Sequence, residues 1–435
     1  MRNTYITLHS YSGNKLIVYL KFQVGTILFP EIMDSTYPNH PKTTTMQVKI
    51  INNREVKIWT DYVEESAMRQ IENLTTLPFL FHHLAIMPDV HSGMGMPIGG
   101  VLACDGVIVP NAVGADIGCG MCAVKTNWKV AEIPTEILRD KIMADIHARI
   151  PLGMNHHEQA QDKAFLPQDY DLDQLKVVKL QQENIRHQVG TLGGGNHFIE
   201  LQRDEEDTLW IMIHSGSRNL GKKVGEYYNQ VAATLNEKWY STVKPEIQMP
   251  FLPCESKEFG MYWKEMNYCV DFALCNRRLM MQRIQEVLAE ALPGITFEPM
   301  INIAHNYAAF ERHFGKDVIV HRKGATLARK GIIGIIPGSQ GTASYIVEGL
   351  GNPESFCSCS HGAGRKLSRK EAIRNLDMEA EVTRLNAKGI LHAIQCQDDM
   401  QEATGAYKDI EEVIANELDL IKVKTRLLPI AVVKG

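Results

Sequence analysis

Side chains that can ligate a metal recur in short glycine-rich segments of this chain. The segment GADIGCG holds Asp116 and Cys119, and three later segments hold His197, His214 and His305. A carboxylate, a thiolate and imidazoles together suit a borderline divalent metal such as zinc, manganese or cobalt. This set exceeds what one tetrahedral ion with an open position needs. We therefore expect a two-metal site bridged by Cys119, an arrangement suited to phosphoryl transfer.

A further histidine, His361, lies in the segment SHGAGR. This segment and IIPGSQGTASY are rich in small residues, whose backbone N–H groups can bind phosphates. A neutral imidazole at this position could attack an α-phosphate and carry a nucleotide covalently. It could instead be a sixth metal ligand or a hydrogen-bond donor to phosphate. Neither segment matches GxxxxGK[ST] or GxGxxG, so the motif by itself is a weak nucleotide signal.

The elements that must position these side chains alternate between strand and helix patterns. The runs LWIMI, ITFEPMINI and GIIGII are apolar nearly throughout, which is typical of strands covered on both faces. The pattern predicts strands at 47–51, 98–103, 107–109, 121–125, 208–213, 297–303, 317–321 and 332–336. It predicts helices at 62–74, 134–149, 173–187, 220–239, 262–291 and 369–387, the last opened by a capping box of Ser368 and Glu371. We expect one large α+β domain of mixed sheets flanked by helices, with an active site built from glycine-rich loops at strand ends.

The composition, 44% hydrophobic and 22% charged over 435 residues, indicates a soluble globular protein. The formal net charge of −5 gives no overall attraction to nucleic acid, so a polyanion must dock on a local basic patch. Candidate patches lie beside the glycine-rich loops at Arg218, Arg322 and Arg365, although each taken alone is a solvated face. The nine cysteines are an odd number, and Cys357 and Cys359 form CxC and not CxxC, so we expect reduced thiols and a cytoplasmic protein.

Residues 1–45 end in a run rich in proline and threonine, just before an alternating segment that starts at Met46. We interpret 1–45 as an N-terminal extension of uncertain role and 46–435 as the folded domain. The apolar stretch near the N-terminus is broken by Lys21 and Gln23, so it predicts neither a membrane span nor a signal peptide. We expect no membrane partner.

Taken in order, the glycine-rich segments resemble the RtcB family of RNA-splicing ligases, which join RNA ends in a reaction that needs GTP and manganese. The matching runs are MPDVHSGMGMPIGG, GADIGCGM, GTLGGGNHFIEL, IMIHSGSRNLG, HNY, RKGA, IIPGSQGTASYIVEGLGN, ESFCSCSHGAGR, AYKDI and the terminal VKG. They extend from about residue 46 to residue 435. Gln340 departs from the pattern because the family usually has methionine there, and 150–185 and 240–298 match only loosely.

The resemblance implies that Asp116, Cys119, His197, His214 and His305 hold two Mn²⁺ ions, with Cys119 as the bridge. It implies that His361 becomes guanylylated by GTP. The implied nucleotide contacts are Asn196, His197, Phe198, Ile199, Glu200, His305, Asn306, Pro337, Gly338, Ser339, Gln340, Ser344, His361, Gly362, Ala363, Gly364, Tyr407 and Lys434. Arg218 and Arg365 are expected to bind RNA phosphates.

The implied reaction joins an RNA 2′,3′-cyclic phosphate or 3′-phosphate end to a 5′-hydroxyl end, in RNA splicing or repair. An activating protein such as archease is a possible partner of such a ligase. Two alternatives stay open. One is a metal-dependent phosphodiesterase acting on cyclic phosphate ends of RNA, which does not need His361. The other is a catalytically silent paralogue that binds RNA ends.

Overall fold

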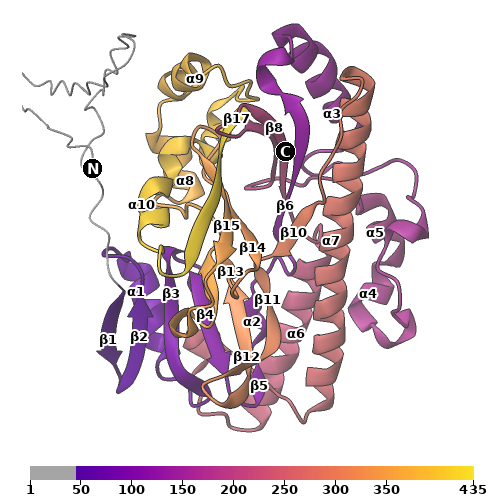
Figure 1. The fold of residues 1–435 in the computed structure, drawn as a ribbon. Coiled ribbons are helices and arrows are strands. Elements are labelled where there is room, and N and C mark those ends of the chain that lie inside the picture. The colour runs from indigo at the N-terminus through magenta and orange to yellow at the C-terminus, as the bar shows by residue number, and fades with distance from the viewer. Residues whose placement is uncertain (1–45) are drawn as a thin grey trace, which may run out of the picture. The chain divides into compact units, whose positions relative to one another are not determined.

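Two β-sheets form the frame that carries the candidate site (Figure 1). The computed structural model describes residues 46–435, which belong to one compact unit of mixed α and β structure. The extension predicted at 1–45 lies outside the described residues, and its boundary at Met46 stays a prediction.

The first sheet has six strands in the order β1-β2-β3-β4-β12-β11. Its neighbours are antiparallel except for β2 and β3, which run parallel. The strands are β1 (Gln47–Ile51), β2 (Arg54–Ile58), β3 (Leu80–His91), β4 (Ile98–Cys104), β12 (Lys316–Lys323) and β11 (Asn306–His313).

The second sheet has seven strands in the order β10-β6-β8-β7-β17-β15-β14, and every neighbouring pair is antiparallel. The strands are β10 (Ile301–Ala304), β6 (Gly120–Lys129), β8 (Thr208–Ser215), β7 (Phe198–Arg203), β17 (Ile421–Lys434), β15 (Ser344–Gly349) and β14 (Ile333–Ile336). Two small pairs complete the strands: β13 (Ala325–Leu327) with β16 (Ser358–Ser360), and β5 (Val107–Ile108) with β9 (Leu252–Pro253).

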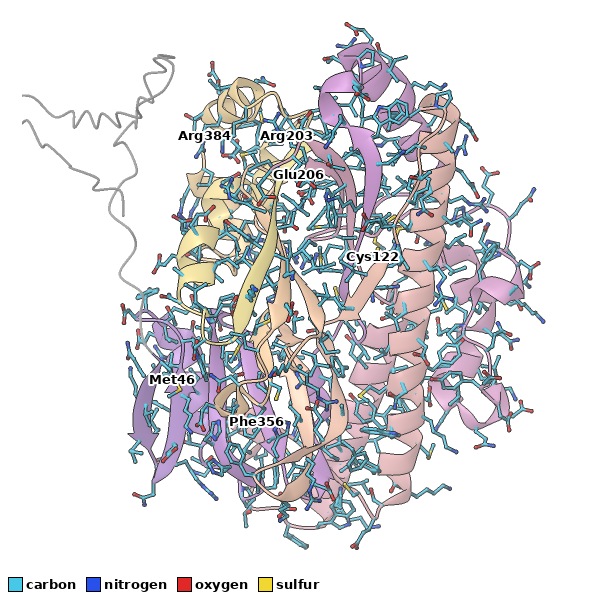
Figure 2. The ribbon with its side chains drawn as sticks, in the orientation of Figure 1. Met46, Cys122, Arg203, Glu206, Phe356 and Arg384 are labelled. Carbon is cyan, nitrogen blue, oxygen red and sulfur yellow. The ribbon has the colours of Figure 1, made fainter. Side chains whose placement is uncertain are left out.

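One long helix, α7, packs along the second sheet (Figure 1). Ile211 and Ile213 of β8 form a buried core with Met280 and Ile284 of α7, and Cys122 of β6, labelled in Figure 2, belongs to the same core. The helices are α1 (Glu65–Leu74), α2 (Pro110–Val113), α3 (Ala144–Arg149), α4 (Lys176–Leu180), α5 (Gln182–Gln188), α6 (Leu220–Lys238), α7 (Lys257–Ala291), α8 (Arg369–Asn375), α9 (Met378–Ala387) and α10 (Ile410–Ala415). None of the helices within residues 46–435 combines the length and apolarity that crossing a bilayer needs.

Several predicted elements differ in their bounds. The helix predicted at 369–387 is two helices, because Leu376 has extended dihedrals (φ −90°, ψ 139°) that end α8, whereas its capping box of Ser368 and Glu371 is confirmed. The helix predicted at 173–187 is likewise split into α4 and α5. The long strands β3, β11, β15 and β17 were not predicted. In β17, Pro429 argues against a strand, and the structure accommodates it at a register shift.

Candidate active site

Four neighbouring strands of the second sheet deliver the metal-ligand candidates to one edge. Cys119 directly precedes β6, His197 directly precedes β7, His214 lies at the end of β8, and His305 follows β10. Because β10, β6, β8 and β7 are adjacent and antiparallel, the starts of β6 and β7 lie beside the ends of β8 and β10. Strand order therefore brings together residues that are far apart in sequence.

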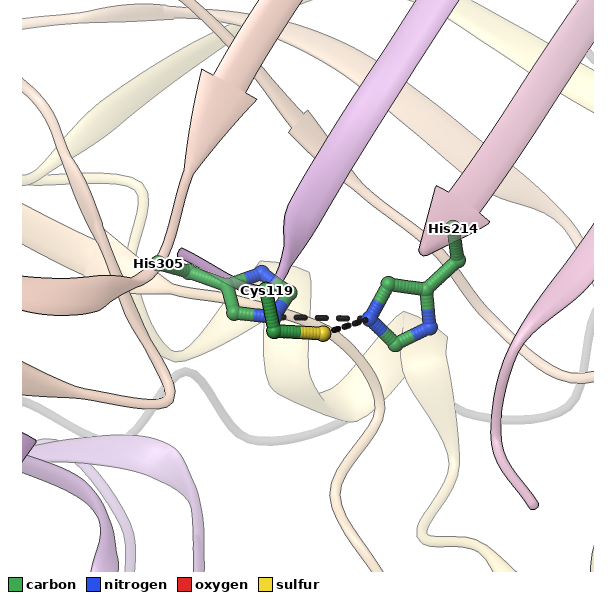
Figure 3. Close-up of side chains that lie close together, drawn as sticks. All are labelled: Cys119, His214 and His305. Atoms are coloured by element: carbon green, nitrogen blue, oxygen red, sulfur yellow. Dashed lines mark hydrogen bonds between the residues drawn. The ribbon is translucent and has the colours of Figure 1, made fainter. Parts of the chain in front are cut away.

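The donor atoms of these residues point at one another. Cys119 Sγ lies 3.3 Å from His214 Nε2 and 3.5 Å from His197 Nε2. His214 Nε2 is 3.4 Å from His305 Nε2, and Figure 3 shows the two rings and the Cys119 sulfur converging. Asp116 Oδ2 is 3.2 Å from His197 Nε2. Two potential metal-binding groups result, Cys119 with His214 and His305, and Cys119 with Asp116 and His197, so the thiol is common to both.

Hydrogen bonds at the far side of two rings fix which nitrogen is free to ligate. His197 Nδ1 lies 3.0 Å from the Leu192 carbonyl, and His214 Nδ1 lies 3.0 Å from the Asn196 carbonyl. A carbonyl can only accept, so each Nδ1 carries a proton, and Nε2 is the nitrogen that faces the cluster and can ligate a metal ion. In the metal-free protein, thiol or imidazole hydrogens can lie between these atoms, and a metal ion that replaced those hydrogens would be ligated by the same atoms. The donor set and its orientation therefore fit divalent metal ions.

Burial sets the protonation of the cluster. It lowers the pKa of His214 and of His305 well below the ordinary value, which keeps both imidazoles neutral and able to ligate. Burial, followed by the nearby Asp116 carboxylate, raises the pKa of the Cys119 thiol well above its usual range. Burial also raises the pKa of Asp116, but in the metal-free protein a proton on His197 Nε2, through its hydrogen bond and charge, outweighs it and lowers the pKa to about 2. The thiol therefore needs a cation to ionise, as a metal supplies.

Two consecutive residues of α7 hold the loops behind the cluster. The buried Arg277 donates to the carbonyl of Ser215 at 2.7 Å, of Gly118 at 3.1 Å and of Ile303 at 3.1 Å. These carbonyls belong to the segments that carry His214, Cys119 and His305. The buried Asn276 donates to Gly216 O at 3.2 Å. The long helix thus sets the spacing between ligands that come from separate strands.

The loop after β8 approaches Asp116 so closely that only glycine fits. A Cβ atom built on Gly216 would lie 2.4 Å from Asp116 Oδ2. Any side chain at this position would displace the carboxylate from His197. The absence of a side chain at Gly216 therefore allows the Asp116 carboxylate to stay beside His197.

His361 enters the site from a different part of the fold, directly after β16. Its Nδ1 lies 2.5 Å from Asp89 Oδ2, and its backbone N–H donates to the same oxygen at 3.0 Å. Asp89 belongs to β3 of the first sheet and is fully buried. The His361 ring packs against His305 at 4.8 Å between centroids. The His361 side chain is thus fixed in orientation beside the metal-ligand cluster.

A cavity of about 600 Å³ opens beside His361. This volume suits a nucleotide-sized ligand. The metal-ligand candidate His214 lines the cavity. So do the following residues that were predicted to contact GTP: Asn196, Phe198, Glu200, Pro337, Gly338, Ser339, Gln340, His361, Gly362, Ala363, Gly364, Tyr407 and Lys434. Most of the predicted nucleotide contacts therefore share one cavity.

The remaining predicted contacts lie around this cavity and not on its surface. Ile199 alternates with Phe198 along β7, so its side chain packs in the core against α7. The Ser344 hydroxyl accepts from the Gly338 N–H at 3.3 Å and supports the loop that lines the cavity. Asn306 donates to Asp116 O at 3.1 Å, and His197 and His305 belong to the metal-ligand cluster. Direct contact of these side chains with a nucleotide stays a prediction.

The cavity is also lined by a buried carboxylate, Glu402, that four side chains contact. Arg365 and Arg369 donate to its Oε1 at 3.2 and 3.3 Å, Tyr407 donates to Oε2, and Lys434 Nζ lies 3.7 Å from Oε2. Burial raises the pKa of Glu402, but the charges of Lys434 and Arg365 outweigh it, so the net pKa is lowered. We call these five residues the Glu402 network.

The two predicted RNA-phosphate residues are already engaged with the protein. Arg365 donates to Glu402, to Tyr407 Oη at 3.3 Å, and to the carbonyls of Leu367 and Gln401. Arg218 donates to Thr191 Oγ1 at 2.8 Å and to Gly153 O at 2.9 Å. Arg365 lines the cavity, whereas Arg218 lies beside Gly193 and His197. Their contact with RNA stays a prediction.

Reasoning from the sequence missed Asp89, Arg277 and Glu402. Asp89 stands between Pro88 and Val90 in the run MPDVHSG, and a charge among the apolar residues of this segment was a usable signal. Arg277 lies among the apolar residues of a long helix, which is also an unusual place for a charge. Glu402 lies in a polar segment, QDDMQEA, and nothing in that pattern distinguishes it from its exposed neighbours.

Comparison with known proteins gives one family. The model of the family described as "tRNA-splicing ligase RtcB" matches residues 70–435. RNA-splicing ligase RtcB1 of Escherichia coli ATCC 25922 is 38% identical over 408 residues, which cover 88% of this chain and 98% of the relative. RNA-splicing ligase RtcB of Escherichia coli K12 has the same identity and coverage. tRNA-splicing ligase RtcB of Nanoarchaeum equitans is 31% identical, over 91% of this chain and 97% of the relative.

Proposed function

The chain belongs to the RtcB family, and we propose that this RNA ligase uses GTP and manganese to join RNA 2′,3′-cyclic phosphate or 3′-phosphate ends to 5′-hydroxyl ends. His361 is the proposed nucleophile toward GTP. The single observation that carries the proposal is the position of His361, which packs against the metal-ligand candidate His305 and lines the nucleotide-sized cavity.

Asp89 prepares His361 for nucleophilic attack. Its carboxylate accepts from Nδ1, so the neutral imidazole presents the Nε2 lone pair. The second hydrogen bond, from the backbone N–H of His361, prevents the carboxylate from swinging away. As Nε2 bonds to the α-phosphorus of GTP, the bond to pyrophosphate breaks, and Asp89 stabilises the positive charge that develops on the ring.

Two Mn²⁺ ions, held by Asp116, Cys119, His197, His214 and His305, would neutralise charge on the reacting phosphates. Asp116 supplies a carboxylate that stays ionised at neutral pH, since its pKa is about 2. His197 and His214 supply Nε2 lone pairs fixed by their carbonyl partners. Manganese is taken from the family resemblance, because a mixed set of oxygen, nitrogen and sulfur donors also suits other divalent metals.

The part of the cavity lined by β7, next to the metal-ligand cluster, suits a purine base. Phe198 offers a ring face, with Lys434 Nζ 5.7 Å from its centroid. Glu200 lines the same wall, and burial raises its pKa to about 7. A carboxylate of this kind accepts hydrogen bonds from N–H groups, which guanine offers at its pairing edge. The assignment of GTP as the co-substrate rests on this wall and on the family.

The test is to incubate the protein with Mn²⁺ and α-labelled GTP and to isolate protein-bound GMP. We expect an adduct that is labile in acid and stable in base, as a phosphoramidate is, and its loss in His361→Ala. Asp89→Asn should reduce adduct formation by about 100-fold or more, because the tautomer of His361 is no longer imposed.

The alternatives give different results. A phosphodiesterase would open cyclic phosphate ends at an undiminished rate in His361→Ala and would form no adduct. A silent RNA-end-binding paralogue would turn over no GTP at saturating Mn²⁺ and RNA. An absent adduct in the metal-loaded wild type would therefore contradict the proposal. A location in the cytoplasm and activation by archease stay predictions.

A further inference from the structure

Besides His361 and His214, a third histidine, His91, lines the cavity. His91 is the last residue of β3, two positions after Asp89. Its Nδ1 lies 3.0 Å from the Asp89 backbone carbonyl, while the Asp89 side chain holds Nδ1 of His361. Asp89 therefore orients both His91 and His361.

The hydrogen bond to Asp89 determines what His91 offers to the cavity. Because a carbonyl can only accept, Nδ1 of His91 carries the proton and Nε2 is left with a lone pair. Within residues 46–435, His91 Nε2 has no hydrogen-bond partner, and the ring keeps some solvent exposure. Lys408 fixes the strand end, since its Nζ donates to the carbonyls of Pro88 at 3.1 Å and Val90 at 2.6 Å. His91 thus presents a positioned acceptor.

The position of His91 differs from that of the histidines proposed to ligate metal or to attack GTP. His361 packs on His305 and so connects the cavity with the metal-ligand cluster. His91 belongs to neither potential metal-binding group. Ser66 and Ser92, which line the cavity with His91, are exposed, so this side of the cavity is open to a strand end from solvent.

Burial keeps His91 unprotonated. It is the main cause that lowers the pKa of His91 to about 4; the hydrogen bond and charge of Asp89 oppose it, and the charges of Lys408 and of a protonated His361 add to it. Glu64, which accepts from the Ser92 N–H at 2.6 Å, is an acidic group that also lines the cavity. Anionic RNA and GMP phosphates in the cavity raise the pKa of a neighbouring imidazole and so strengthen it as a base.

We propose that His91 is the general base that takes the proton from the RNA 5′-hydroxyl during sealing. This inference rests on the proposed ligase function. The 5′-oxygen loses its proton to His91 Nε2 and forms a bond to the 3′-phosphorus. The bond from that phosphorus to the GMP oxygen breaks, GMP leaves with the electron pair, and the imidazolium returns its proton to solvent.

The experiment separates sealing from guanylylation. RNA that already carries the activated 3′-GMP end is mixed with 5′-hydroxyl RNA and metal-loaded protein, and single-turnover sealing is measured. For His91→Asn, whose side chain can still donate to Asp89 O, we expect sealing to fall by about 100-fold or more. We expect the His361–GMP adduct to form at a rate reduced far less. His82→Asn is the matched control, because His82 is exposed on the same strand and, with φ 59°, sits in a conformation that asparagine tolerates.

Two readouts distinguish a base from a structural residue. Without the base, sealing should rise by about tenfold per pH unit from about pH 7 to 9, as the attacking hydroxyl must ionise by itself. The second readout uses RNA that ends in a 5′-thiol. A free thiol has a pKa of about 8.5, so it ionises without a base. This RNA should therefore restore sealing by His91→Asn to near the wild-type rate.

Three outcomes would overturn the inference: sealing by His91→Asn at the wild-type rate, equal loss of sealing and adduct formation, or no rescue by the thiol. Loss of cyclic-phosphate opening with normal sealing would also overturn it, because the base would then serve water. If wild type forms no adduct and seals no ends, the proposed function itself fails, which is a separate result.

Discussion

The metal-ligand cluster and the Glu402 network are associated with one cavity but differ in how completely they are satisfied. In the cluster, the Nε2 atoms of His214 and His305 face each other at 3.4 Å, beside the Cys119 sulfur. In the network, one carboxylate is contacted by three cationic side chains and a phenol. The cluster therefore needs a cation from outside, whereas the network supplies its own countercharges.

This difference indicates that the metal-ligand cluster binds a ligand, whereas the Glu402 network holds neighbouring side chains in position. Groups that lack partners within the protein gain the most from a ligand, because binding ionises a thiol. Groups that already have partners hold neighbouring residues in place, as Glu402 holds Tyr407 and Lys434 on the cavity wall. We therefore expect substitutions in the cluster to act on metal-dependent properties, and substitutions in the network to act on stability first.

Cys119→Ala should have the largest effect, since the thiol belongs to both potential metal-binding groups. We expect loss of Mn²⁺ binding and of the GMP adduct together, with adduct formation reduced below detection. The unfolding free energy without metal should change little in comparison. At Mn²⁺ concentrations about 100 times the dissociation constant, wild type should gain about 2.7 kcal/mol that the variant does not gain.

Isothermal titration with Mn²⁺, followed by denaturant unfolding with and without the metal, measures both effects. Cys122→Ala is the control, because Cys122 is buried three positions away in the core and belongs to neither group. An adduct formed by Cys119→Ala at the wild-type rate would contradict the bridging role and the contrast between the two regions.

Glu402→Gln should have the next largest effect. We expect it to lower the free energy of unfolding whether or not metal is present. The substitution leaves the positive charges of Arg365 and Lys434, which are partly buried, without their carboxylate partner, which costs about 3 kcal/mol of unfolding free energy at neutral pH. Because the net pKa of Glu402 is lowered in the folded protein, its contribution is fully present above the ordinary value of 4.5. The contribution is lost as the pH falls below that value, so the difference from wild type should shrink in acid.

Urea unfolding of wild type and Glu402→Gln at about pH 7 and about pH 4 tests this expectation. Gln401→Ala is a control at the adjacent position, where only the backbone carbonyl contacts Arg365. Equal stability of wild type and Glu402→Gln at both pH values would show that the network is not the stabilising region.

The contrast also explains what could be predicted from the sequence. The ligand candidates could be named from two local signals: Asp116, Cys119, His197 and His214 lie in glycine-rich segments, and His214 and His305 stand at the ends of apolar strand patterns. The strand order that brings them together could not be read locally, because β10 pairs with β6 across almost 180 residues of chain. Glu402 could not be identified, because its burial results from α8 and β17 packing around it and not from its own neighbours in sequence.

Glu200→Gln should have the smallest effect. Glu200 is intermediate between the metal-ligand cluster and the Glu402 network in how completely its charge is compensated. It is buried and its hydrogen bond comes from Gln202 at 2.6 Å, with no cation within salt-bridge distance in the described part of the chain. Its pKa is raised to about 7, above the ordinary 4.5, so ionisation destabilises the fold progressively as the pH rises from 4.5 and fully above 7. That difference corresponds to about 3 kcal/mol, of which a neutral glutamine should recover about 2 after the altered hydrogen bond with Gln202 is counted. Thermal unfolding should therefore show Glu200→Gln to be more stable than wild type at about pH 8 and no more stable at about pH 4. If the variant is less stable than wild type at both pH values, the charge of Glu200 is compensated within the protein, as the charge of Glu402 is in the Glu402 network.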